Sequence, residues 1–323
     1  MSATISIAPT AAIPSRVIVR ASTKFVMTGV AEGVRSFGSP RRAVILAAIV
    51  VANVQHITRS AVRTWRYAGS DQIPPDSERR PVSVNSLALS VGLPFETVRG
   101  HINALIDEGL CIKTDLGIIV PNEVLTSAKV VASEQVVWDA FWSMIEELRL
   151  INFDFEAVRR RTDIQTALVL EPGFPTDVGQ PPRRLISRVT AEFYVSCILS
   201  GAAAYGDWGA ASVASVVMVA NAEQLAQDPQ QAWLYSTQDA PPPDEIRRPV
   251  TIREVAQRLN MDRESVRRQF HVLVAQDKLI KVDGGYLSNM KFLQTPAVLK
   301  SGMDMVTAFY RMIYDLTALG VRL

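Results

Sequence analysis

Apolar residues recur along this chain at helical spacing, and the same series of segments occurs twice. Near the end of each half, apolar residues lie three or four positions apart, which places them on one face of a helix. These residues are Val137, Phe141, Met144, Ile145 and Leu148, with counterparts Met305, Phe309, Met312, Ile313 and Leu316. The pattern predicts a mainly helical chain in which each half closes with an amphipathic helix.

The segments ahead of that helix follow one plan. A helical segment at about 15–36 precedes a very apolar helix at about 41–58, and the second half repeats the two at 183–204 and 209–226. Each half then has a loop ending in Arg-Arg-Pro-Val, two short amphipathic helices, and a pair of short strands around a glycine-containing turn. We therefore expect small β-hairpins, or β-wings, on an otherwise α-helical fold.

A gapless offset of 168 residues relates the two halves. It aligns residues 23–150 with 191–318, and 34 of the 128 aligned positions carry the same amino acid. Similarity at a fixed period is typical of a repeated architecture. The expected organisation is a flexible tail (1–14), a first unit (15–152), a connector and linker (153–182) and a second unit (183–323).

The centre of each unit has the features of a helix-turn-helix. Ser83 and Thr251 are suited to cap a first short helix, and Thr251 with Glu254 has the spacing of a capping box. Gly92 and Asn260 follow that helix, and both residue types tolerate the positive φ of a tight turn. A second amphipathic helix and the hairpin come next.

These segments resemble the DNA-binding domains of bacterial winged-helix transcriptional regulators. The stretch LPFETVRGHINALIDEGL is similar to the recognition helix of the GntR type, whose Ser-Arg-Thr-Thr-Val-Arg run enters the DNA groove. The helices on both sides of the motif resemble the MarR type, in which terminal helices of two subunits pack together. The resemblance implies tandem winged helix-turn-helix units that form a single-chain pseudo-dimer.

The resemblance also implies which side chains contact DNA. In the first unit they are Thr97 and Arg99, whereas Phe95 replaces the first arginine of the motif. The candidates in the second unit are Arg253, Arg263, Glu264, Ser265, Arg267 and Arg268. Lys113 and Lys281 share one position in the wing, where they are either DNA contacts or solvated strand lysines.

The distribution of charge differs between the two motifs. The whole chain has a formal charge of only +2, so the location of basic residues matters more than their total. Residues 79–121 contain four basic and four acidic residues, whereas 247–289 contain nine basic and five acidic residues. Because each neutralised phosphate adds to affinity, we expect the second unit to be the stronger DNA contact.

Arginine pairs precede the first motif helix of both units. They are Arg79 with Arg80 and Arg247 with Arg248. Two interpretations are open: the arginines contact phosphates, or they pair with Asp76 and Asp244 in the preceding loop.

A polar residue interrupts the most apolar helix of each half. Asn53 and Asn221 occupy equivalent positions. A buried amide needs hydrogen-bond partners, so these residues either are satisfied locally and fix the helix register, or line a small-molecule effector pocket with Trp65 and Trp233.

Several classes of function are not expected. The two cysteines, Cys111 and Cys197, lie far apart, and the three histidines have no metal-ligand spacing, so no metal or cofactor is predicted. No nucleotide-binding, nucleophile-elbow or zinc-protease motif occurs, which argues against an enzyme. Without a signal peptide or a membrane-length apolar run, we expect a cytoplasmic, nucleoid-associated protein.

The expected function is that of a sequence-specific regulator of transcription that binds double-stranded DNA through two non-identical motifs. A small-molecule effector, and either a monomeric pseudo-dimer or a homodimer, are both compatible with the sequence. Two alternatives remain, a DNA-binding protein similar to replication initiators and a winged-helix scaffold that binds other proteins.

Overall fold

The computed structural model describes residues 13–175 and 181–323. Over these ranges the chain is mainly helical, with two small antiparallel sheets of two strands each, and this part of the sequence prediction is confirmed. The expected N-terminal tail lies outside the described residues apart from Ile13 and Pro14.

The first half begins with two long helices that meet at a sharp turn. Its elements are α1 (Ser15–Phe37), α2 (Pro40–Thr58), α3 (Ala61–Arg66), η1 (Asp76–Glu78), α4 (Val84–Val91), α5 (Phe95–Asp107), β1 (Ile112–Thr114), β2 (Gly117–Ile119), α6 (Asn122–Thr126) and α7 (Ala128–Arg149). Gly38 ends α1 with φ of 82°, a conformation that glycine adopts without strain. Ser39 then caps α2 by accepting a hydrogen bond from the Arg42 N–H at 3.2 Å.

The second half repeats this series of elements. They are α9 (Arg183–Tyr205), α10 (Trp208–Asn221), α11 (Glu223–Gln227), α12 (Pro229–Leu234), η2 (Asp244–Ile246), α13 (Ile252–Leu259), α14 (Arg263–Ala275), β3 (Leu279–Val282), β4 (Gly285–Ser288), α15 (Met290–Leu293) and α16 (Pro296–Ala318). Most of them begin 168 residues after their counterparts, so the offset found in the sequence recurs in the element bounds.

One expected helix differs from its counterpart. The sequence pattern predicts a continuous helix over 209–226, but α10 ends at Asn221 and α11 begins at Glu223. The Glu223 carboxylate accepts a hydrogen bond from Arg258 of α13 at 2.7 Å. The equivalent residues of the first half are Gln55 and Ser90, which make no such ion pair, so the break coincides with a contact that only the second half has.

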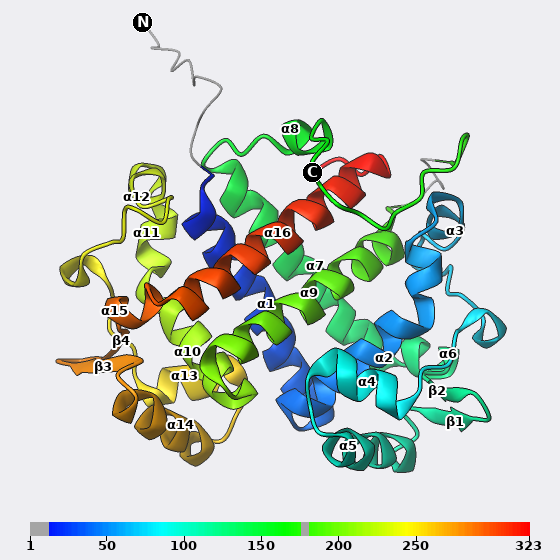
Figure 1. Cartoon of the computed structure of the whole chain (residues 1–323), viewed down its shortest axis with the longest axis horizontal. Coiled ribbons are helices and arrows are strands. Elements are labelled where there is room, and N and C mark those ends of the chain that lie inside the picture. Colours follow the sequence, from blue (N-terminus) through cyan, green and yellow to red (C-terminus); the bar gives the residue numbers. More distant parts are fainter. Residues whose placement is uncertain (1–12, 176–180) are drawn as a thin grey trace, which may run out of the picture.

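Four long helices form the centre of the molecule. α1, α7, α9 and α16 cross there, while α2 and α10 lie to either side (Figure 1). α1 packs along α7, and α9 packs along α16. Phe25 of α1 and Phe193 of α9 stack with ring centroids 6.1 Å apart, and one continuous core of buried apolar residues joins the two halves.

Matching residues make the contacts between the halves. Phe25 and Phe193 occupy equivalent positions, so a residue here meets its own counterpart. The Arg16 N–H donates to the Ser236 carbonyl at 2.9 Å, and the Arg184 N–H donates to the Ala68 carbonyl at 2.9 Å. Adding 168 to 16 and to 68 gives 184 and 236, so each bond is the image of the other. Reciprocal contacts of this kind are typical of a two-fold interface.

Much of the expected connector is folded against the second half. α8 (Phe155–Arg159) packs on α16, and its Phe155 and Val158 are buried. Further on, Val169 forms an isolated parallel bridge with Ser60, which also donates a hydrogen bond to Glu171. The connector is therefore packed at α8, where Phe155 and Val158 are covered, whereas the exposed Val169 is joined to the first half by its main chain.

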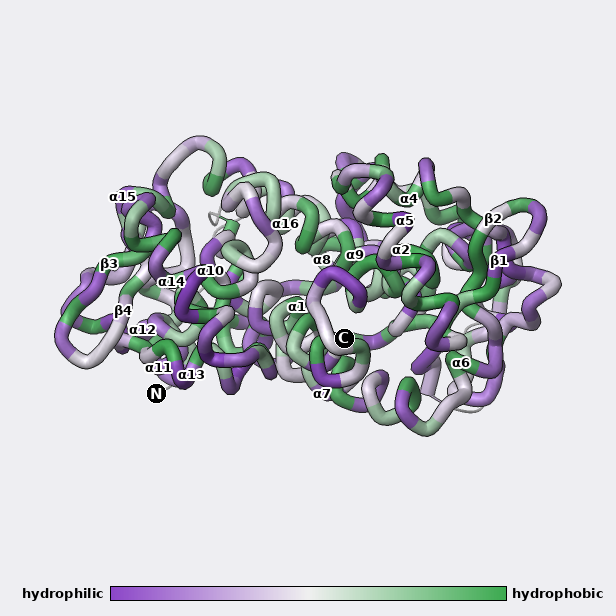
Figure 2. Tube along the Cα trace, turned by 90° about the horizontal axis from the view of Figure 1, so that it is seen from below, coloured by the Kyte–Doolittle hydropathy of each residue, from purple (hydrophilic) through white to green (hydrophobic). Residues whose placement is uncertain are grey.

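The helices α5 and α14 lie along one edge of the molecule, the lower edge in Figure 1. Figure 2 views the molecule from that side and shows β1 and β2 at one end and β3 and β4 at the other. The two candidate recognition helices therefore share an edge, and a hairpin lies outside each of them.

Within 13–175 and 181–323, no helix taken alone has both the length and the apolar composition to cross a membrane. The pair α1 and α2 passes that test only when counted together, and the two helices meet at 102°.

Candidate nucleic-acid interface

The two short helices ahead of each hairpin are built alike. Ser83 and Thr251 accept hydrogen bonds from the main-chain N–H three residues on, at 3.1 and 3.2 Å, so both residues cap as expected. Gly92 and Asn260 end α4 and α13 with φ of 64° and 51°. Both turns between the helices are therefore the ones that the sequence predicts.

The capping box expected at Thr251 is only half formed. The Glu254 side chain makes no hydrogen bond to the Thr251 N–H in this described segment; its carboxylate binds Arg248 and Arg258, at 2.6 and 2.9 Å. Two guanidinium partners offer charge-assisted hydrogen bonds, which are stronger than a bond to one neutral main-chain N–H.

Each hairpin is joined to the segment before the helix-turn-helix. Val82 forms an isolated bridge with Ile118, and Val250 forms the equivalent bridge with Tyr286. Gly285 has φ of 152°, and a Cβ at this position would collide with the main chain of Val250. The glycine is therefore needed so that the two main chains can come this close.

Asn53 and Asn221 hold the wings to the core helices. The Asn53 side-chain amide donates to the carbonyls of Arg80 and Ile118, at 2.8 and 3.1 Å, and its oxygen accepts from the Val120 N–H at 2.9 Å. Asn221 makes the equivalent three bonds in the second half. Both side chains are buried and fully used, which supports the local interpretation of these residues.

The predicted DNA contacts of the second half are mostly exposed. They are Arg253 on α13, Arg263, Glu264, Arg267 and Arg268 on α14, and Lys281 on β3, with Ser265 partly covered. Arg267 pairs with Glu264 at 3.0 Å, and Arg268 donates to Ser265 at 2.9 Å. Arg253, Arg263 and Lys281 have no ion-pair partner in the part of the chain that the structure describes, so their charge is available to a ligand.

Four of the nine basic residues of 247–289 serve the fold instead. Arg247, Arg248 and Arg258 pair with carboxylates, and Lys278 donates to the Tyr205 carbonyl at 3.0 Å. A count of charges along the sequence could not separate these residues from the exposed ones.

The arginine pairs ahead of the motifs also include both buried arginines that serve the fold and an exposed one. Arg79 is buried, bonded to Asp76 at 3.2 Å and to the Pro74 carbonyl at 3.2 Å. Arg247 is also buried, where it binds Asp244 and the Ser288 carbonyl. Arg79 and Arg247 are therefore not phosphate contacts as the fold stands. Arg248 is partly covered and held by Glu254, and Arg80 alone of the four is exposed.

The surface of the first motif has less available charge. Both Nε and Nη2 of Arg99 bind one oxygen of Glu96, at 2.9 and 2.5 Å, while Thr97 and Lys113 are exposed. Leu89 and Leu116 are 77% and 80% exposed, and Phe95 is 43% exposed.

Sequence reasoning missed this apolar surface. The signal was present, because the equivalent residues of the second half are Gln257, Gly284 and Arg263.

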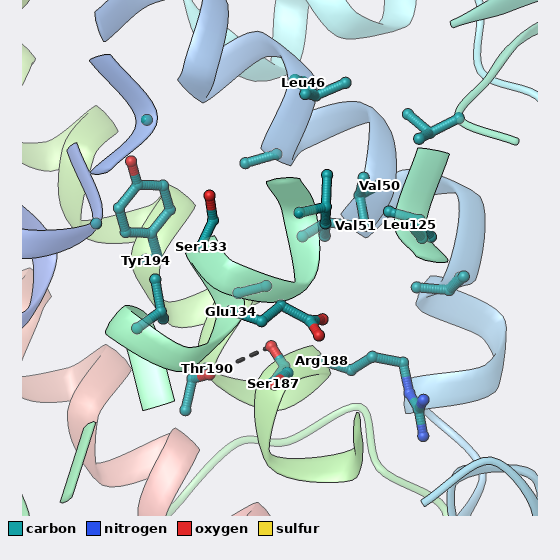
Figure 3. Close-up of a pocket in the computed structure, with 18 of the residues that line it drawn as sticks. Leu46, Val50, Val51, Leu125, Ser133, Glu134, Ser187, Arg188, Thr190 and Tyr194 are labelled. Atoms are coloured by element: carbon teal, nitrogen blue, oxygen red, sulfur yellow. Dashed lines mark hydrogen bonds between the residues drawn. The ribbon is translucent and has the colours of Figure 1, made fainter. Parts of the chain in front are cut away.

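The residues expected to line an effector pocket do not come together. Trp65 is buried, with its indole N–H bonded to the Leu319 carbonyl at 3.0 Å, whereas Trp233 is 48% exposed. Both asparagines are engaged by the wings, and none of these four side chains lines the cavity between α1, α2, α7 and α9. A cavity of about 250 Å³ lies elsewhere, between α1, α2, α7 and α9 (Figure 3).

No group of three or more His, Cys, Asp or Glu side chains in the described ranges is arranged to hold a metal ion. No family model, curated protein or solved structure matches the chain.

Proposed function

We propose that this chain is a sequence-specific regulator of transcription that binds double-stranded DNA through two non-identical winged helix-turn-helix motifs. The observation that carries the proposal is the placement of α5 and α14 along one edge of the molecule, with a hairpin outside each and unpaired cations around α14. A helix of this kind fits the major groove, where base edges can be read, while flanking cations contact phosphates.

We further propose that the chain is a fused duplication that acts as a single-chain pseudo-dimer. The equivalent element bounds, the stacked Phe25 and Phe193, and the reciprocal bonds of Arg16 and Arg184 support this view. In symmetric dimers of this type, the two half-sites lie about 34 Å apart. The proposal includes a cytoplasmic, nucleoid-associated location and no enzymatic role.

Genome-wide mapping of bound sites tests this function directly. Bound sites at promoters, recovered again from random duplex DNA in vitro, would support a regulator. Iterated sites at an origin of replication would instead support an initiator-like protein, and the absence of enriched sites would contradict DNA binding altogether.

A second candidate function is that of a scaffold that contacts another protein through the first motif. The exposed Leu89, Phe95 and Leu116 favour it, because apolar side chains on a DNA-facing surface gain nothing from phosphates. Replacing the three with the second-half residues (Leu89→Gln, Phe95→Arg, Leu116→Gly) should strengthen DNA binding if the motif faces DNA. It should leave DNA binding unchanged if that surface is used for a protein.

A further inference from the structure

The cavity of about 250 Å³ has an apolar side and a polar side (Figure 3). Leu46, Val50 and Val51 of α2 form much of the apolar side, with Leu125 of α6 beside them. Figure 3 places Glu134, Ser187, Arg188 and Thr190 together at the other side. A concave, mostly apolar space with a few grouped polar side chains is the usual form of a small-molecule site.

The cavity is lined by three arginines, Arg79, Arg184 and Arg188, and by three glutamates, Glu32, Glu134 and Glu192. Arg184 binds Glu134 at 2.8 Å, and Arg79, which also lines the cavity, binds Asp76. Arg188 is buried and donates to two main-chain carbonyls, of Tyr67 at 2.8 Å and of Thr64 at 2.9 Å. It has no carboxylate within ion-pair distance in the described residues, whereas Arg79 and Arg184 each have one.

Donors at this side are left without partners. Nε of Arg188 and Nη1 of Arg79 are buried and make no hydrogen bond in the described structure. A buried charged group without a full set of partners is unfavourable unless something else supplies an acceptor. Burial and the neighbouring Arg184 and Arg79 lower the pKa of Arg188 to about 9, because they too make its charged form less favourable.

The second half contains a smaller counterpart of this cavity. Its volume is about 100 Å³, and it is lined by Arg16 and Arg20, which are equivalent to Arg184 and Arg188. Met218 replaces Val50 and fills part of the space, and Gly302 replaces Glu134.

The counterpart arginine has an ion partner of its own. Arg20 lies 3.8 Å from the carboxylate of Glu147. Asp315 is equivalent to Glu147, but it accepts a hydrogen bond from Thr166 at 2.6 Å and forms no ion pair with Arg188. The larger cavity therefore combines more space with an arginine whose carboxylate partner is missing.

We propose that the cavity between α1, α2, α7 and α9 binds a small amphipathic carboxylic acid. The apolar part of the ligand lies against Val50 and Val51, and its carboxylate supplies the acceptor that Nε of Arg188 and Nη1 of Arg79 lack. The volume of about 250 Å³ lies just below the range of roughly 300–1,000 Å³ that is usual for ligand sites, which favours a small molecule. The inference concerns ligand binding alone and stands whether or not the chain binds DNA.

Isothermal titration of the full chain with three matched probes tests the proposal. The probes are octanoate, its neutral analogue octanamide, and octylammonium. We expect one octanoate to bind each chain, octanamide to bind at least tenfold more weakly, and octylammonium not to bind. Equal affinity for the acid and the amide would overturn the assignment of a carboxylate, and no heat of binding from millimolar octanoate would overturn the site.

Two matched pairs of variants locate the binding. Arg188→Gln should lower the affinity for octanoate at least tenfold, whereas Arg20→Gln, at the equivalent position of the smaller cavity, should leave it unchanged. Val50→Phe should abolish binding by filling the cavity, and Met218→Phe is its control. Thermal melting confirms that each variant is folded. If Val50→Phe does not fold, the two arginine variants still test the location, and equal effects of Arg188→Gln and Arg20→Gln would overturn it.

Discussion

At the scale of single residues, Asn53 shows how a polar group can specify a largely apolar helix. Its side chain is fully buried in α2, yet all three of its hydrogen bonds go to the loop before the motif and to the hairpin after it. One amide therefore fixes both the register of the helix and the position of the wing.

Replacing Asn53 with alanine should destabilise the protein more than a surface change. Asn53→Ala leaves the Arg80 carbonyl and the Val120 N–H without this partner, while the Ile118 carbonyl keeps its bond from the Val82 N–H, and each unsatisfied buried group costs about 1–3 kcal/mol. We expect the free energy of unfolding, measured by urea denaturation, to fall by about 3 kcal/mol or more. The exposed Asn85→Ala is the control, and a similar loss in both variants would contradict the role of the amide.

The two cysteines should be unreactive in the folded protein. Burial raises the pKa of the Cys111 thiol to about 12 and raises that of Cys197 as well. Because the thiolate is the reactive form, thiol titration at pH 8 should be slow in buffer and fast in denaturant. Rapid labelling of either residue in the native protein would show that its site is open to solvent.

Glu192 should make stability fall as the pH rises. Burial raises the pKa of this carboxyl group from 4.5 to about 7, with Arg59, Arg311 and Asp315 as its charged neighbours. Between these two values the folded state keeps a proton that the unfolded chain has lost, so stability decreases with pH over that window.

The variant Glu192→Gln should therefore have nearly the same stability as the unchanged protein at pH 4.5 and a higher stability at pH 8. Thermal melting across this range measures the effect, and Glu156→Gln at an exposed site is the control. A gain in stability that is independent of pH would point to packing instead of ionisation.

At the scale of elements, α5 and α14 have the same build and different surfaces. Their buried faces match, and Arg99 and Arg267 are each paired with a glutamate three residues before. The halves differ instead at Arg263 and Arg268, which replace Phe95 and Gly100. The unequal charge of α5 and α14 is therefore concentrated in these two exposed arginines, and Arg253 of α13, which replaces Asn85, adds to the difference between the motifs.

The double variant Arg263→Ala with Arg268→Ala should weaken DNA binding and its dependence on salt. Each phosphate contact contributes about 0.9 to the slope of log affinity against log salt concentration, so losing two should lower the slope by about 1.8. Arg99→Ala in α5 should have a smaller effect than Arg267→Ala in α14. Equal losses from those two single variants, measured by fluorescence anisotropy, would contradict the unequal roles.

Local patterns predicted most elements because they depend on neighbours in the sequence. The caps at Ser83 and Thr251 and the turns at Gly92 and Asn260 follow from residue type alone. Partners of charged side chains do not, since Glu254 bonds to Arg248 and Arg258 only in the folded chain. For that reason the sequence predicted the elements that carry the candidate residues, but not how many of the charged side chains on them are available to a ligand.

At the scale of the whole molecule, the proposed pseudo-dimer should leave an asymmetric footprint on DNA. Two recognition helices of different sequence read different half-sites, so a single chain protects two unlike sequences on neighbouring turns of the duplex. Footprinting combined with the mass of the complex in solution measures this. A strictly two-fold footprint would contradict the single-chain mode, or would require two chains on one site.

The features that the sequence did not predict depend on contacts between the halves. Arg184 lies four residues before Arg188 on the same helix, but only the fold reveals that Arg79 of the other half is also a neighbour. The repeat contained one signal that the sequence analysis overlooked. Arginine occurs at the equivalent positions 16 and 184, and again at 20 and 188, which marks a pair of charged residues common to both halves.

The bond between Trp65 and the Leu319 carbonyl spans 254 residues of sequence. During synthesis, the first half of the chain leaves the ribosome long before α16, which covers part of its central helices, has been translated. Contacts this distant in sequence make folding slow, and surface left uncovered in the meantime is prone to aggregation. The nascent first half should therefore depend on chaperones until the last helix emerges.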